Sequence, residues 1–255
     1  VDATQMSQAF LGAGYIQSIA LGEVAEFLAG DRVVSTPVVD LAMRNRFNPG
    51  LDNTWFMGVM ELINNVTMLS IVLTGAALIR EREHGTIEHL LVLPLKPSEI
   101  MLAKVWAMGA VVLLATALAL QFVLRDGLGM PVSGSIGLFL TGCALHLFAT
   151  TSMGIYLGTV ARSMPQMGLL MILVLLPLQI LSGGMTPTES MPDLVRYLMM
   201  GAPTTHFVSF AQAILYRGAD LSIVWPQVAA IGLIGATFFV AALRRFRSTV
   251  SSMQN

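Results

Sequence analysis

Long apolar runs, most of them close to twenty residues, divide this chain into segments that are almost free of charge. A helix needs roughly 20 apolar residues to cross a bilayer core, and it satisfies its backbone hydrogen bonds internally while doing so. Only 11% of the 255 residues are charged, whereas soluble domains average about a quarter. We therefore expect an all-α polytopic membrane protein. Its five spans are predicted over residues 57–79, 105–124, 135–160, 165–181 and 223–243.

Residues 1–54 carry more charge than the rest and are expected to lie in water. Hydrophobic periodicity predicts a helix over residues 3–29, and rough alternation predicts a strand over residues 38–47. A segment of this size is small for an independent core. We therefore expect the remnant of an α/β extracytoplasmic domain at the N-terminus, with most of that domain preceding Val1.

A polar island, Arg80–Lys104, separates the first two predicted spans and carries eight charged residues, four of each sign. Ile87, Leu90 and Leu91 share one helical face, and Pro94 ends the helix. The pattern predicts a short amphipathic helix in water, tied to a membrane span at each end. A charged run of this kind can also be no more than the solvated end of a helix.

The basic residues of the short loops indicate the orientation of the chain. With the island in the cytoplasm, that side holds eight Lys and Arg residues: Arg80, Arg82, Lys96, Lys104, Arg162, Arg244, Arg245 and Arg247. The opposite short loops hold three: Arg125, Arg196 and Arg217. This asymmetry follows the positive-inside rule. It predicts that residues 1–54 are extracytoplasmic and that the tail, residues 248–255, is cytoplasmic.

Two further segments depart from a simple series of spans. The third predicted span is rich in Gly, Ala, Ser and Thr, which let helices approach closely in lipid, so we expect it inside the bundle. Residues 190–217 contain two apolar pieces that are too short to cross a bilayer. They fit either two re-entrant helices or two helices that lie along the membrane surface.

Several kinds of chemistry are disfavoured by the sequence. His84 and His89 are five residues apart, which does not stack them as metal ligands on one helical face, so we expect no metal site. No Gly-x-x-x-x-Gly-Lys-[Ser/Thr] loop occurs in the sequence, so we expect no ATP hydrolysis and no cofactor in this chain. Cys143 is the single cysteine, which excludes an intrachain disulfide. The net charge of −1 gives no reason to expect nucleic acid.

The island resembles the cytoplasmic coupling segment of ABC-2 type transporter permeases. The residues that carry the resemblance are Glu81, Glu83, Gly85, Thr86, Glu88, Leu90 and Pro94. Later motifs extend it over nearly the whole chain: Leu181-Ser182-Gly183-Gly184 and Pro203-Thr204-Thr205-His206. Before the first span, Arg44-Asn45-Arg46-Phe47-Asn48-Pro49 is similar to a motif of bacterial export permeases with a large extracytoplasmic domain.

The resemblance implies an ABC-2 (type V exporter-like) transmembrane domain over residues 55–247, acting as the permease of an efflux system in the bacterial inner membrane. A separate ATP-binding subunit, which holds ATP and Mg, would dock on the coupling helix. The docking residues would be Glu81, Arg82, Glu83, Gly85, Thr86, Ile87, Glu88, Leu90, Leu91 and Pro94. A second permease copy or a homologous permease would complete a dimer in the bilayer, and a periplasmic adaptor and an outer-membrane channel are further candidate partners.

Five residues are candidates for the transport path or its gate. Glu61 is ionisable within the first span, although a position at the headgroups would also explain it. His146 is either a hydrogen-bonding residue between helices or a proton relay, and Gln179 either serves carbonyls freed by a nearby proline or lines the path. The resemblance also implies that the two short helices of residues 190–217 close the outer end of the path, and Pro203 and His206 would begin a helix of this gate.

The apolar spans favour a hydrophobic or amphipathic cargo, either drug-like or lipid. Two alternatives stay open at this point. An ion-coupled secondary transporter would need an acidic or histidine relay within the spans, for which Glu61 and His146 are the candidates. A membrane assembly factor without transport activity would not need a tethered amphipathic helix.

Overall fold

The computed structural model describes residues 6–29, 53–85 and 96–253. Within these ranges the chain forms helices and turns, and no strand. The all-α class expected from the apolar runs is confirmed. The predicted strand over residues 38–47 and the predicted amphipathic helix of the island lie outside the described residues. The chain divides into two units, Val1–Phe56 and Met57–Asn255.

The described part of the first unit is mainly one helix, α1 (Met6–Ala29), which agrees with the helix predicted over residues 3–29. Tyr15, Ile19 and Phe27 on this helix are exposed. Because the remainder of the expected α/β remnant falls on residues that the structure does not describe, that domain stays a prediction.

Within the described residues, four helices are long and apolar enough to cross a membrane. They are α2 (Asn53–Glu83), α4 (Pro97–Leu118) with its π-helical continuation η1 (Ala119–Gly127), α5 (Ile136–Val160) and α9 (Leu221–Met253). A fifth apolar helix, α6 (Met164–Ile180), has 17 residues and is only about 25 Å long. It coincides with the fourth predicted span, which is shorter than a bilayer core about 30 Å thick.

The packing of the second unit centres on α5. This helix packs against α4, α6, α8 and α9. It also approaches α2 so closely that a Cβ atom at Gly154 would lie 2.6 Å from the carbonyl oxygen of Ile71. A Cβ atom at Gly158 would lie 3.1 Å from the carbonyl oxygen of Gly75. Small residues thus let two backbones meet, as expected in lipid, and the interior position predicted for this span is confirmed.

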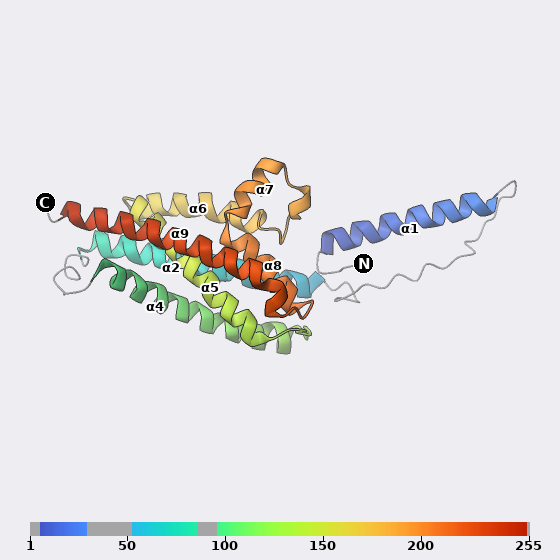
Figure 1. Ribbon diagram of the computed structural model, residues 1–255, viewed down its shortest axis with the longest axis horizontal. Coiled ribbons are helices and arrows are strands. Elements are labelled where there is room, and N and C mark those ends of the chain that lie inside the picture. The colour runs from blue at the N-terminus through green and yellow to red at the C-terminus, as the bar shows by residue number, and fades with distance from the viewer. Residues whose placement is uncertain (1–5, 30–52, 86–95, 254–255) are drawn as a thin grey trace. The chain divides into compact units, whose positions relative to one another are not determined.

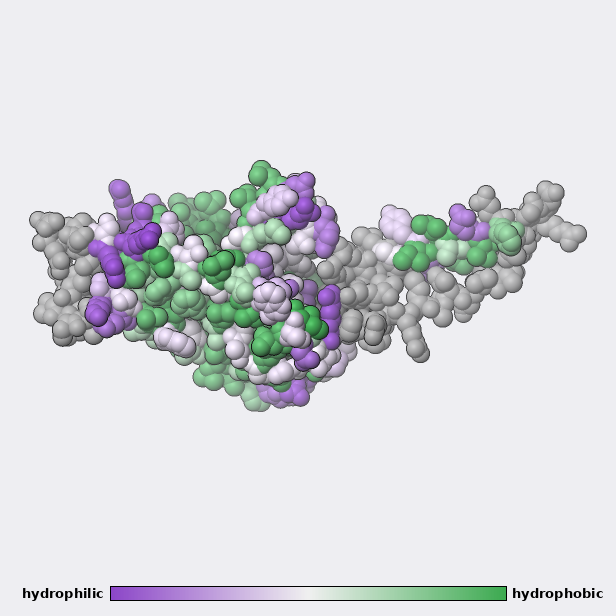
Figure 2. Space-filling view, in the orientation of Figure 1, coloured by the Kyte–Doolittle hydropathy of each residue, from purple (hydrophilic) through white to green (hydrophobic). Residues whose placement is uncertain are grey.

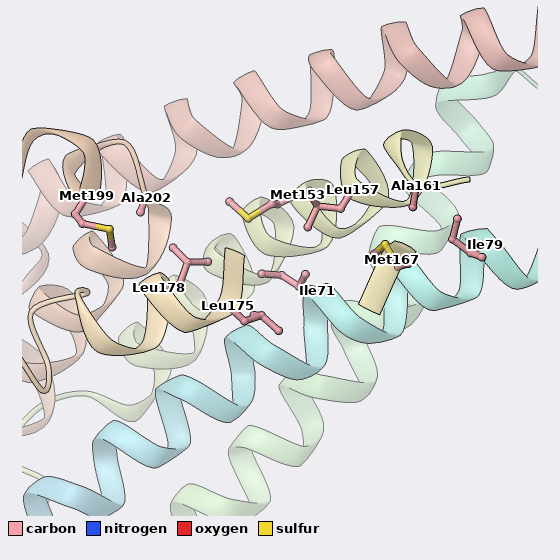
Figure 3. Close-up of a cluster of buried hydrophobic side chains, with 10 residues drawn as sticks. All are labelled: Ile71, Ile79, Met153, Leu157, Ala161, Met167, Leu175, Leu178, Met199 and Ala202. Carbon is pink, nitrogen blue, oxygen red and sulfur yellow. The ribbon is translucent and has the colours of Figure 1, made fainter. Parts of the chain in front are cut away.

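A cluster of buried apolar side chains fills the space between α2, α5 and α6, and it extends to the short helix α7 (Asp193–Met200) and the residue that precedes α8 (Figure 3). Its members are Ile71, Ile79, Met153, Leu157, Ala161, Met167, Leu175, Leu178, Met199 and Ala202. Sulfur-containing side chains fill irregular gaps readily, and Met153, Met167 and Met199 are part of this cluster.

Two short helices follow α6, as the two apolar pieces of residues 190–217 predicted. After a 3-10 turn, η2 (Thr188–Ser190), the chain forms α7 and then α8 (Pro203–Leu215). α8 is a helix of the bundle interior, because Phe207, Phe210 and Ile214 are completely buried against its neighbours. In contrast, α7 exposes Leu194 and Tyr197.

One end of the bundle gathers the segments that charge counting assigns to the cytoplasm. There the last turn of α2 meets the first turns of α4 (Figure 1). Phe246 of α9 packs with Leu78 and Ile100. Hydrophilic residues gather at the ends of the bundle, and hydrophobic residues cover its middle (Figure 2). This arrangement fits helices that cross a membrane in alternating directions.

Candidate functional site

Three consecutive charged residues at the end of α2 each contact a different helix. Glu81 forms an ion pair with Lys104 in α4. Arg82 donates hydrogen bonds from Nη1 to the carbonyl oxygens of Gly158 (3.2 Å) and Ala161 (2.8 Å) at the end of α5. The carboxylate of Glu83 accepts a hydrogen bond of 3.0 Å from the backbone N–H of Met164, where α6 begins. We call Glu81, Arg82 and Glu83 the α2 clamp.

The α2 clamp uses backbone groups that helix ends leave without partners. Within their own helices, the last carbonyls of α5 have no donor and the first N–H groups of α6 have no acceptor. A guanidinium beside a helix C-terminus and a carboxylate beside a helix N-terminus both complement the helix dipoles. The sign of each clamp residue therefore matches the helix end that it contacts, and the end of α2 is tied to α4, α5 and α6 together.

The remaining residues of the predicted docking surface are only partly described. Gly85 adopts a φ of 70°, the left-handed conformation that commonly follows the end of a helix. The predicted docking residues that lie outside the described part of the chain are Thr86, Ile87, Glu88, Leu90, Leu91 and Pro94. Docking of a partner on this segment therefore stays a prediction, and the contacts of Glu81, Arg82 and Glu83 within the chain are an addition that the sequence did not reveal.

A second polar connection joins α2 to α5 deep in the bundle. The Thr67 hydroxyl donates to the carbonyl oxygen of Ile63 (3.0 Å), so it accepts the 2.9 Å hydrogen bond from His146 Nε2. Ser70 donates to Thr150 Oγ1 (2.7 Å), which itself donates to the backbone oxygen of His146 (3.0 Å). We call Thr67, Ser70, His146 and Thr150 the buried polar seam, since all four are buried.

His146 also connects the buried polar seam to α8. Its ring stacks on the ring of Phe207, with centroids 4.2 Å apart and planes 5° from parallel. Because Nε2 donates to Thr67, the second ring nitrogen, Nδ1, is the acceptor of this neutral tautomer, and it has no hydrogen-bond partner within the described residues. His146 thus occupies the junction of α2, α5 and α8, which supports the alternative of a residue that joins helices.

The predicted gate residues Pro203 and His206 lie in the first turn of α8, next to this junction. Pro203 is buried at the start of the helix, where a missing N–H costs nothing. His206 forms a 2.8 Å hydrogen bond with the carbonyl oxygen of Met200 and so ties α8 to α7. At the other end of α8, burial raises the pKa of the Tyr216 phenol well above its ordinary value.

The two other predicted path residues lie apart from this junction. Glu61 is exposed, and it accepts a 2.7 Å hydrogen bond from Asn65. It precedes Arg80 by 19 residues, about 28 Å along a helix, which favours its alternative position at the opposite headgroups. Gln179 is half-buried near the end of α6. Among the described residues, no hydrogen bond or ring contact joins Glu61 or Gln179 to His146.

The partners of His146 were not predicted from the sequence, although the sequence contains a signal for them. Thr67, Ser70 and Thr74 recur at helical spacing on α2, and His146, Thr150 and Gly154 do so on α5. Two such stripes of small and hydroxylated residues favour a close, hydrogen-bonded pair of membrane helices. For metal, the described residues contain no group of three or more His, Cys, Asp or Glu side chains that could hold an ion.

Helices of membrane-spanning length, an apolar middle and a charged end together define a multi-pass helical membrane protein. Comparison with known families identifies it further, because the model of the family described as ABC-2 type transporter matches residues 6–216. The chain belongs to this family. It is therefore a membrane component of an ABC transporter and not the subunit that hydrolyses ATP.

Curated relatives agree with this assignment. The chain is 63% identical over 253 residues to the inner membrane transport permease YhhJ of Escherichia coli K12, covering 99% of this chain and 68% of the relative. It is 29% identical over 254 residues to the probable multidrug ABC transporter permease YbhR of the same strain, covering 98% and 67%. A third relative, the probable multidrug ABC transporter permease YbhS, is 27% identical over 213 residues, which cover 79% and 55%.

Proposed function

We propose that this chain forms the membrane path of an ATP-binding cassette exporter and that a separate ATP-binding subunit drives it through the island, residues 80–104. The observation that carries the proposal is the α2 clamp. Both ends of the island continue into membrane helices, α2 and α4, and the clamp extends that connection to α5 and α6. A push on the island therefore acts on four helices at once.

The bundle offers a route from the clamp to the opposite end. α5 has 25 residues and is about 37 Å long, and its C-terminal carbonyls are held by Arg82. Nearer its N-terminus, His146 stacks on Phe207 of α8. In our proposal, displacement of the island shifts α5 relative to α2, and α5 carries α8 with it. Opening of the path at the α8 end would follow docking and ATP hydrolysis at the other.

The cargo that we propose is hydrophobic or amphipathic, such as a drug-like molecule or a lipid. A groove between α4 and α5 supports this, because its lining is entirely apolar: Val105, Trp106, Gly109, Ala110, Leu113, Ala144, Leu147 and Phe148. The names of the relatives YbhR and YbhS describe probable multidrug permeases. We further propose that two permease chains pair in the bilayer, with a periplasmic adaptor and an outer-membrane channel as additional partners.

Co-purification with the ATP-binding subunit and ATP-dependent transport test the proposal together. Glu83→Lys places a positive charge at the positive N-terminus of α6, and Leu90→Asp places a charge on the predicted apolar face of the coupling helix. We expect both changes to abolish ATP-dependent transport and Leu90→Asp to release the ATP-binding subunit. Asp193→Lys, at an exposed position of α7, is the control. It should retain both ATP-dependent transport and binding of the ATP-binding subunit. Intact complex formation and transport in Glu83→Lys and Leu90→Asp would refute the coupling role.

A further inference from the structure

The exposed face of α9 changes character along its length. Leu233, Val240, Arg244 and Arg247 are all exposed, and their spacings of seven, four and three residues place them on one helical stripe. Leu233 is 73% exposed, as expected for a side chain that faces lipid. This stripe is therefore apolar within the predicted membrane layer, at Leu233 and Val240, and it ends in the two arginines Arg244 and Arg247.

The depth of these arginines follows from the length of α9. Trp225 is exposed near the start of the helix, and tryptophan is enriched at the membrane boundary. Arg244 follows it by 19 residues, about 28 Å along the helix, which matches a hydrocarbon core about 30 Å thick. Arg244 then lies at the level of the headgroups on the opposite side, with Arg247 one turn beyond it.

Contacts among the described residues explain the position of this helix but not its charges. Phe246, between the two arginines, is buried against Leu78 and Ile100, which fixes the rotation of α9. A helix dipole stabilises basic residues in the last turn of a helix. Because α9 continues to Met253, Arg244 and Arg247 lie before its last turn and do not gain this stabilisation. α9 contains no Asp or Glu, so its own side chains cannot neutralise them.

We propose that Arg244 and Arg247 form a binding site for the phosphate of anionic phospholipids in the leaflet at this end of the bundle. The guanidinium group presents a planar fork of donors that matches phosphate oxygens. The acyl chains of the same lipid would pack along Leu233 and Val240. Basic residues beside a membrane attract anionic lipid headgroups, and here they stand on the lipid-facing stripe. The inference does not depend on the proposed transport function.

Lipid binding to the purified full chain tests the site directly. Native mass spectrometry would compare the binding of phosphatidylglycerol and phosphatidylcholine to the unchanged chain, to R244Q/R247Q and to R244K/R247K. We expect a preference for phosphatidylglycerol that falls about fivefold for each arginine replaced by glutamine and that survives largely in the lysine variant. R125Q, on an exposed arginine bonded to Gln121 outside this stripe, is the matched control and should keep the preference. A thermal melt shows that each variant remains folded.

Four results would overturn the site. The first is an unchanged phosphatidylglycerol preference in R244Q/R247Q, and the second is an equal loss in R125Q. The third is competition by inorganic phosphate at the concentrations at which phosphatidylglycerol binds, since the site would then bind a free anion and not a lipid. The fourth is loss of the ATP-binding subunit by R244Q/R247Q without any change in lipid binding, which would make this surface a protein interface.

Discussion

The α2 clamp and the buried polar seam both join α2 to α5, yet they are built from different chemistry. The clamp is charged and lies at the end of the bundle, where Glu81 and Lys104 keep 28% and 16% of their side chains exposed. The seam is made of hydroxyl and imidazole groups, and Thr67, Ser70, His146 and Thr150 are completely buried. A buried charge costs far more than a buried neutral group that forms hydrogen bonds.

This difference assigns the two connections different tasks. The seam lies beside Gly154 and Gly158, where the two backbones meet, so it fixes how α2 and α5 pack. The clamp contacts three separate helices near one end of the bundle. Its ion pair contributes little to stability, because partly exposed ion pairs are weak, but the contacts of the clamp connect helices that must move together. We therefore expect seam variants to lose stability and clamp variants to lose coupling.

A large effect on stability is expected at the close approach beside the seam. In Gly154→Ala the new methyl group would lie 2.6 Å from the carbonyl oxygen of Ile71, and such overpacking costs about 1–3 kcal/mol or more. Gly168→Ala in α6 is the control, because nothing lies within 4 Å of its Cβ position. Thermal unfolding of the purified chain should show a lower midpoint for Gly154→Ala alone. Equal midpoints for the two variants would disprove the close approach of α2 and α5.

His146 offers two substitutions that separate packing from hydrogen bonding. His146→Ala removes the stack on Phe207 as well as the bond to Thr67, and the cavity should cost about 3 kcal/mol. His146→Phe preserves a stacked ring and loses only the hydrogen bond, which averages about 0.6 kcal/mol between membrane helices. Chemical denaturation should rank the alanine variant well below the phenylalanine variant. The reverse ranking would show that the hydrogen bond, and not the stack, holds this junction.

The smallest effect on stability is expected for the ion pair of the clamp. Glu81→Gln removes the ion pair and should cost about 1 kcal/mol or less, as partly exposed pairs do, and the loss should shrink at high salt. The double variant Glu81→Lys/Lys104→Glu restores an ion pair with the charges exchanged. It should recover ATP-dependent transport that either single change reduces. If the double variant transports no better than the single ones, the contact between α2 and α4 has no role in coupling.

The helices could be predicted from the sequence because apolar runs and prolines act locally. The interior position of α5 followed from its small residues, and the two short helices followed from apolar pieces separated by a proline. The contacts of the clamp could not be predicted. Arg82 meets Ala161 and Glu83 meets Met164 across 79 and 81 residues of sequence, and only the packing of α2 against α5 brings them together. The π-helical conformation of η1 could not be predicted either, because its residues do not differ in kind from those at the end of an ordinary span.

Transport per ATP hydrolysed in Arg82→Gln tests the central claim most directly. The measurement uses the chain reconstituted with its ATP-binding subunit, compared with the unchanged complex and with Arg125→Gln as control. The glutamine side chain is shorter than that of arginine and carries no charge, so it should lose the contact with the end of α5. We predict that the complex still assembles and still hydrolyses ATP. Its transport per ATP should fall by about 5- to 150-fold, the usual range of a coupling free energy between sites. An assembled Arg82→Gln complex with an unchanged ratio would contradict the account.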